Sequence, residues 1–208
     1  MSVCRSIVRR AVAVSLPLAL SACASSPPTY YYTLLPTGGT PAVAEARYQI
    51  EVLPVDVPAQ VDVPQMVVRT GGGEVTPVET RRWIAPLPNE LRGALSWQLT
   101  HQLGVKDVYG FSGGDVASTY RIHLRVTRFD SAPGAYARID ALWSAGTADA
   151  KAAAPLCSSS AQISVMPGYA ELAQGHQQAL AKIAAEIAAN IGAAQTSGKP
   201  PSCGANAG

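Results

Sequence analysis

The sequence predicts a single α+β domain, with a mostly antiparallel or mixed sheet and two main helices packed on it. From Thr119 to Phe129 apolar and polar side chains alternate, which is the two-residue period of a half-buried strand. Two other segments, 86–104 and 169–191, carry apolar residues every three or four positions, the period of an amphipathic helix. Because no repeat or second composition regime interrupts them, we expect one domain over residues 30–195.

Short strands are expected before the first helix. They are the β-prone run Tyr30–Leu35, the alternating segment Tyr48–Leu53, Met66–Arg69, and a further strand that starts at Glu74. Between the last two stand Gly71, Gly72 and Gly73. These glycines favour a hairpin over a phosphate loop, because neither a helix nor a Lys-Ser/Thr pair follows them.

Proline and glycine residues mark where the two helices begin and end. The first has Pro88 near its start, a leucine stripe at every fourth position, and Gly104 as its stop. An antiparallel hairpin of Thr119–Phe129 with Tyr136–Ser144 follows it. We expect a loop over 146–160, a short strand over Gln162–Met166, and a final helix from Tyr169 to Ile191 that ends at Gly192.

The first 22 residues are typical of a signal peptide. Arginines precede an apolar stretch from Ala11 to Leu20, which is about half the ~20 residues that a membrane-spanning helix needs. The whole chain has a formal charge of +2, but removal of this segment would leave 13 basic against 14 acidic residues. A nucleic-acid partner is therefore not expected.

Cys23 is the candidate lipid attachment site. Leu20-Ser21-Ala22-Cys23 resembles the bacterial lipoprotein processing box, in which the cysteine is acylated and the chain is cut just before it. Several acyl chains on one residue would hold the protein permanently in a membrane. Residues 23–29 then form a Ser/Pro tether, and Ala24 in place of aspartate resembles an outer-membrane address. The alternative is an ordinary secretory signal that leaves a soluble protein with a free thiol.

Two further cysteines, Cys157 and Cys203, remain in the oxidising compartment that a signal peptide implies, and we expect them to form a disulfide. That bond would tie the Gly/Pro/Ser-rich tail, residues 196–208, to the domain. A metal site is not expected, because the cysteines and the three histidines lack the close spacing of zinc ligands.

No catalytic motif is present in the sequence, and we expect no catalytic residue and no cofactor. His176 lies on the apolar stripe of the last helix, where a core histidine bonded to the backbone is favoured over a general base. His123 stands between Arg121 and Arg125 on one strand face. This face is interpreted as a charged surface partly paired with Asp140; the alternative is a basic patch that binds lipid headgroups or an acidic partner.

Two local groups have both a structural and a functional interpretation. Glu79 and Arg82 precede Trp83, and they form either a local ion pair or a recognition element. Tyr30, Tyr31 and Tyr32 are interpreted as a strand, with an aromatic membrane anchor as the alternative. His101 is the third histidine that a dispersed active site would use.

A family resemblance follows from motifs that occur in order along nearly the whole chain. They are the box Leu20–Cys23, Tyr31–Leu34, Val63–Arg69, Glu79–Trp83 with Pro86-Leu87, the strand Tyr120–Phe129 and the helix Leu180–Ile191. Together they resemble the PqiC/YmbA-like lipoproteins, auxiliary components of ABC-type transport systems. The resemblance supplies no catalytic residue, and the cysteine pair is not part of its pattern.

The resemblance implies a non-enzymatic lipoprotein on the periplasmic side of the outer membrane. Its expected partner is an MCE-domain protein (PqiB-like) and, through it, an inner-membrane permease and ATPase that move phospholipid and support membrane integrity. A homo-oligomer that matches the symmetry of the MCE tube is also implied. Two alternatives stay open: a structural envelope lipoprotein without a transport role, and a periplasmic hydrolase.

Overall fold

The computed structural model of the protein describes residues 26–38, 46–111, 119–147, 153–198 and 201–203. In chain order its elements are β1 (Tyr30–Tyr32), β2 (Gln49–Val52), β3 (Gln65–Gly71), β4 (Glu74–Trp83), α1 (Leu87–Leu103), β5 (Thr119–Ala132), β6 (Tyr136–Thr147), β7 (Cys157–Ser164) and α2 (Tyr169–Ser197). The predicted signal peptide and Cys23 lie outside the described residues.

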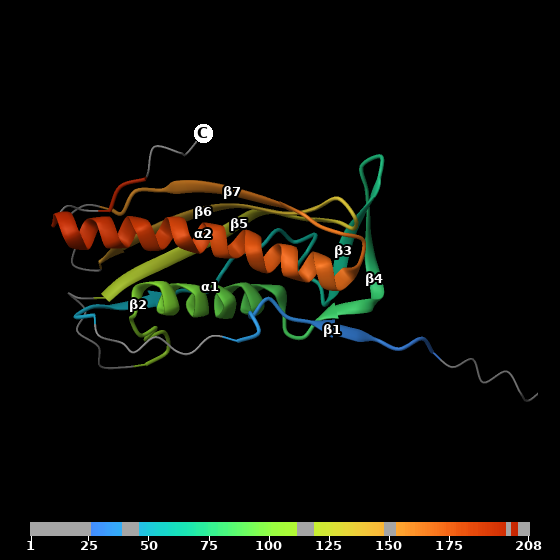
Figure 1. Ribbon diagram of the computed structural model, residues 1–208, viewed down its shortest axis with the longest axis horizontal. Helices are drawn as coiled ribbons and strands as arrows, with labels where there is room; N and C mark the ends of the chain where they lie inside the picture. Colours follow the sequence, from blue (N-terminus) through green and yellow to red (C-terminus); the bar gives the residue numbers. More distant parts are fainter. Residues whose placement is uncertain (1–25, 39–45, 112–118, 148–152, 199–200, 204–208) are drawn as a thin grey trace, which may run out of the picture.

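The described residues form two sheets and two helices (Figure 1). The four-stranded sheet has the order β2-β5-β6-β7, in which β5, β6 and β7 are antiparallel neighbours and β2 runs parallel to β5. The smaller sheet has the order β1-β4-β3, with β1 parallel to β4. Helices α1 and α2 lie side by side on one face of the larger sheet. The predicted α+β class, with a mixed sheet and two main helices, is confirmed.

The core lies between the larger sheet and the helices. Alternate residues of β5 and β6 point inward, because successive side chains of a strand face opposite sides. The buried members are Ile122, Leu124 and Val126 on β5, Ile139, Ala141 and Trp143 on β6, Leu91, Leu95 and Leu99 on α1, and Leu180, Ile183, Ile187 and Ile191 on α2. The leucine stripe of the first helix is thus confirmed as its packing face.

Helix α2 comes very close to the sheet at Gly175. A Cβ atom at this position would lie 2.5 Å from Cγ1 of Val165 and 2.9 Å from Cβ of Ala137. Glycine is required here because it lets the helix backbone approach the sheet more closely than any other residue would.

Two predicted boundaries are wrong. The region 146–160 is not all loop, since β7 begins at Cys157 and ends at Ser164 rather than covering 162–166. Its inward residues are Cys157, Ser159 and Ala161, which alternate with exposed serines and Gln162 and so give almost no hydrophobic contrast.

The second boundary is the end of α2, which passes through Gly192 and stops at Ser197. A glycine inside a helix costs about 1 kcal/mol relative to alanine. Burial of Ile191 and Ala194 on either side, and a hydrogen bond from the Gln195 side chain to the Tyr120 hydroxyl at 2.9 Å, offset that cost. The helix ends instead at Gly198, which adopts the left-handed conformation with φ of 65°.

The glycine-rich hairpin is confirmed. Gly72 and Gly73 form a two-residue turn between β3 and β4, with φ angles of 57° and 88° that side chains rarely allow. Figure 1 shows this hairpin extending beyond the body of the protein.

The segment that follows β1 is fixed to both helices. The buried carboxylate of Glu90, in the first turn of α1, accepts hydrogen bonds from the Thr33 hydroxyl and the Leu34 backbone N–H, both at 2.7 Å. From α2, the Gln177 side-chain amide donates to the backbone carbonyl of Thr33 at 3.0 Å. Both helices therefore hold the segment that follows β1.

Replacing Glu90 with alanine tests this connection. The substitution leaves the Leu34 N–H buried without an acceptor, so we expect Glu90→Ala to lower the free energy of unfolding by about 2 kcal/mol. The neighbouring Asn89 side chain is exposed and provides a control. Asn89→Ala should change the free energy of unfolding by less than about 0.5 kcal/mol. Urea denaturation measures both, and equal losses in the two variants would contradict the role of Glu90.

The C-terminal segment returns to the domain at β7. Cys157 and Cys203 are joined by a disulfide in the structure, with Cα atoms 5.4 Å apart, and the Asn190 side-chain amide donates to the backbone carbonyl of Ser202. The bond closes a loop with a sequence separation of 46 residues. Such a loop lowers the entropy of the unfolded chain.

We expect the Cys157→Ala/Cys203→Ala double variant to lose about 4 kcal/mol of unfolding free energy, the value that the chain-entropy relation gives for this loop. A reductant should destabilise the native protein by the same amount and leave the double variant unchanged. Urea denaturation with and without the reductant measures this difference. A native protein that is insensitive to reductant would contradict the bond.

Candidate functional site

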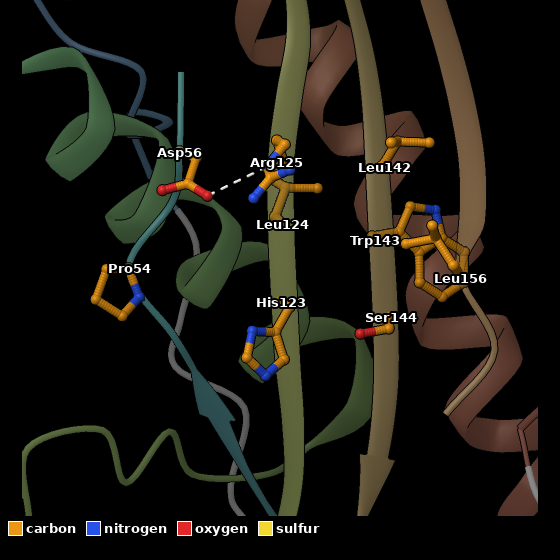
Figure 2. A pocket seen from close by; sticks show the side chains of 9 residues that line it. All are labelled: Pro54, Asp56, His123, Leu124, Arg125, Leu142, Trp143, Ser144 and Leu156. Atoms are coloured by element: carbon orange, nitrogen blue, oxygen red, sulfur yellow. Dashed lines mark hydrogen bonds and ion pairs between the residues drawn. The ribbon is translucent and has the colours of Figure 1, made fainter. Parts of the chain in front are cut away.

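A hollow of about 380 Å³ lies on the face of the larger sheet that carries no helix (Figure 2). It extends from Pro54 and Asp56, which follow β2, across β5 and β6 to Leu156, just before β7. The outward side chains of β5 that reach it are His123 and Arg125. The strand alternation that buries Leu124 directs these two side chains to solvent.

The register of β5 and β6 determines what these side chains meet. His123 is opposite Ser144, and Arg125 is opposite Leu142. Leu156, at the rim of the hollow, is 69% exposed, which is high for a leucine. The hollow thus combines an apolar side, a hydroxyl, an imidazole and a guanidinium.

The arginines of this face are paired, but with other residues than the sequence predicted. Arg121 contacts Glu51 at 2.8 Å, and Arg125 contacts Asp56 at 3.3 Å. Glu51 lies in β2 and Asp56 follows it. The sequence did not reveal that β2 pairs with β5 in parallel. The expected pairing with Asp140 is therefore wrong, although the alternative of a partly paired charged face is confirmed.

Asp140 has its own partners. The bulge between Val126 and Arg128 places it opposite Arg128, and it accepts hydrogen bonds from Arg138 at 2.9 Å and from Ser160 at 2.6 Å. Partial burial raises the pKa of Asp140, but the hydrogen bonds from Arg138 and Ser160 outweigh burial and hold the pKa below its usual value.

The hollow has the chemistry of a contact surface. The side chains of the Arg125–Asp56 pair are 67% and 68% exposed, so a partner's charged group can replace either member at little cost. Among the side chains that line the hollow, no hydrogen bond joins the Ser144 hydroxyl to the His123 ring, as a nucleophile with its base would need.

His176 is a core residue, as the first of its two interpretations predicted. It is fully buried, stacks on Phe129 at 3.9 Å between ring centres, and its Nε2 lies 2.8 Å from the Ser131 hydroxyl. Its partner is thus a side chain rather than the expected backbone group. Burial lowers the pKa of His176 to about 3, although the charge of Asp130 opposes this shift. A ring that is buried and neutral at pH 7 cannot exchange protons with a substrate.

The other two histidines lie on different elements. His101, on α1, contacts the Trp97 carbonyl through Nδ1 at 2.7 Å and stacks on the Trp97 ring. His123 is on the outer face of β5. The three histidines are therefore not assembled into one site. Within the described residues, no cluster of three His, Cys, Asp or Glu side chains has the geometry of a metal site.

The remaining predicted groups have structural roles. Glu79 and Arg82 form the local ion pair, with 3.4 Å between their charged atoms. Tyr30, Tyr31 and Tyr32 form β1, which confirms the strand interpretation, and Tyr32 packs against the core. No helix in the described part of the chain is long and apolar enough to cross a bilayer.

The sequence did not reveal the role of Asp130. Asp130, which is 4% exposed, contacts Arg69 at 3.0 Å and also pairs with Arg128, so it joins β3 of the small sheet to β5 of the large one. Burial raises the pKa of Asp130, but the hydrogen bonds from the two arginines outweigh it and lower the pKa. Arg69 and Asp130 are far apart in the sequence, which therefore held no signal of this contact.

The low pKa of His176 makes the protein sensitive to acid. An unfolded histidine takes up a proton near pH 6.5, whereas folded His176 stays neutral down to about pH 3. Between these values the unfolded state binds more protons, so the free energy of unfolding falls as the pH falls. From pH 7 to pH 4.5 we expect a loss of about 2 to 3 kcal/mol in urea denaturation.

The His176→Phe variant removes this titration, so its stability should depend less on pH, even though the Ser131 hydroxyl loses a partner. His101→Gln leaves His176 in place and should keep the full loss. The same pH dependence in the His176→Phe variant and the native protein would contradict the assignment.

Comparison with known proteins identifies the family. Residues 32–188 match the family of ABC-type transport auxiliary lipoprotein components. Among solved structures, an uncharacterised protein aligns with a TM-score of 0.65 at 21% identity, over 79% of this chain and 99% of its own. A protein of the DUF330 family from Xanthomonas campestris aligns with a TM-score of 0.60 at 18% identity, over 82% of this chain and 100% of its own.

At these identities the two structures establish the fold alone, and no curated protein matches the chain. The family match covers most of the predicted domain and confirms the resemblance to PqiC/YmbA-like lipoproteins. The chain belongs to the family of ABC-type transport auxiliary lipoprotein components.

Proposed function

We propose that this protein is an outer-membrane lipoprotein that faces the periplasm and serves an ABC/MCE-type system for transport of phospholipid between membranes. Acylated Cys23 holds it in the membrane. The domain docks the distal end of an MCE-domain protein (PqiB-like), which connects to an inner-membrane permease and ATPase, and so supports membrane integrity. The observation that carries this proposal is the match of residues 32–188 to transport auxiliary lipoproteins.

Features of the described residues support a docking role. Hydrogen bonds from Glu90 and Gln177 hold the segment after β1 to both helices, so the chain that leads from the proposed anchor is fixed to the domain. The helix-free sheet face offers exposed ion pairs and the hollow around His123 and Arg125. We assign this face to the MCE partner because its charges are exposed and exchangeable, and such charges determine specificity and the rate of association.

The alternatives have less support. A structural lipoprotein without a transport role would share the anchor and the fold, but it would need no transporter partner. A periplasmic hydrolase would need an accessible base. His176, the one histidine of the described residues that lies within hydrogen-bond distance of a side-chain hydroxyl, is fully buried.

Co-purification tests the proposal. The full-length lipoprotein is extracted from its native envelope in mild detergent, and proteins that accompany it are identified by mass spectrometry. We expect an MCE-domain protein to be enriched, and much less of it with Cys23→Ala, which cannot be acylated. Absence of an MCE protein under cross-linking, with Cys23 acylated, would contradict the transport role and favour the structural lipoprotein.

A pair of charge reversals tests the docking face in the same experiment. Arg125→Glu places a carboxylate beside Asp56 at the hollow, and it should reduce recovery of the MCE protein several-fold. Lys182→Glu makes the same change of charge on the exposed side of α2 and should leave recovery unchanged. Equal recovery with both variants would reject this face while leaving the partnership intact.

A further inference from the structure

Apolar side chains are exposed where the chain enters the domain. Tyr30 and Tyr31, the first two residues of β1, are 49% and 58% exposed. Met166, in the turn between β7 and α2, is 73% exposed. None of the three is needed to fill the core, and exposed apolar side chains that lie together mark an interaction surface.

A contact between β1 and the start of α2, together with their neighbours in the chain, places these three residues at the same end of the protein. The Arg81 guanidinium lies 4.2 Å from the centre of the Tyr30 ring and 5.2 Å from that of Tyr169, the first residue of α2. Met166 is three residues before Tyr169. Figure 1 shows the start of β1, the start of α2 and the base of the β3–β4 hairpin together at this end. We call Tyr30, Tyr31 and Met166 the entry surface.

The predicted anchor lies close to the entry surface. Cys23 is seven residues before Tyr30, and an extended chain of that length spans at most about 25 Å. The tether is rich in proline and serine, and Ser26 to Thr29 are exposed. Helix α2 has 29 residues and so leads away from this end for about 43 Å. The far end of the domain is therefore well beyond the reach of the tether.

We propose that the entry surface lies against the lipid headgroups, so that the domain stands end-on upon the membrane with α1 and α2 leading away from it. This inference rests on the anchor in the proposed function. Tyrosine has an apolar ring with a polar tip, and it is enriched at the level of the headgroups. Met166 adds a flexible apolar side chain at the same end of the domain. The lipid surface is thus the occupant that shields these side chains from water.

Charge contributes little to this contact. The basic side chains that strand register and contacts place near the entry surface are Arg81 and Arg82. The acidic ones are Glu79, which pairs with Arg82, and Glu171, whose carboxylate lies against Gly168. Equal numbers of each sign leave no net attraction to anionic lipid. The contact therefore does not require anionic lipid, and neutral vesicles should support it as well as charged ones.

A fluorescent probe at each end tests the orientation. The mature acylated protein carries Met166→Cys or Phe111→Cys, labelled with an environment-sensitive dye, and is placed in vesicles of phosphatidylethanolamine and phosphatidylglycerol. Phe111 is a matched control because it is 79% exposed and follows α1 in the chain. Helix α1 ends, and β5 begins, at the end of the domain away from β1 (Figure 1). We expect a blue shift of emission and quenching by lipid-borne quenchers at position 166, and neither at position 111.

Two further samples complete the test. The Tyr30→Ser/Tyr31→Ser variant should reduce the shift at position 166 while its circular dichroism spectrum stays native, since both rings are exposed. Phosphatidylcholine vesicles should give the same shift as charged ones. Equal spectra at 166 and 111 in an acylated protein would overturn the end-on orientation and leave the transport role untouched. A mass spectrum without acyl groups would overturn the orientation together with the anchor.

Discussion

Burial of one face of the four-stranded sheet beneath α1 and α2 is the constraint on which the rest of the protein depends. It requires apolar residues at alternate positions of β5 and β6, and the remaining positions are thereby left to solvent. His123 and Arg125 are among them, so the hollow on the open face results from the same alternation that makes the core. Both helices also begin at the end of the domain where the chain enters, and both lead away from that end.

A few polar contacts add the segment after β1 to this packing. Glu90 and Gln177 hold the residues after β1 from two different helices, and the disulfide holds the opposite terminus at β7. The segment after β1 and the segment that contains Cys203 are thus both held by the domain. In the proposed function, where Cys23 is the anchor, the fold therefore determines which surface is offered to a partner.

Sequence periodicity predicted the elements that have strong hydrophobic contrast, including β5, the leucine stripe of α1 and most of α2. It failed at β7, where serine and alanine occupy inward positions, and at Gly192, where packing outweighs helix propensity. At the candidate site it identified His123, Arg121 and Arg125, but not their partners. Asp56 and Glu51 reach them only because β2 pairs with β5 in parallel, and Arg69 meets Asp130 only because the two sheets adjoin. Such contacts are set by topology, which local periodicity does not encode.

The proposed anchor is tested most directly by the intact mass of the protein recovered from separated inner and outer membranes. We expect a chain that begins at Cys23, carries acyl groups and is found in the outer-membrane fraction. A chain with an unmodified Cys23 in the soluble periplasmic fraction would contradict it, because neither the docking role nor the end-on orientation exists without the anchor.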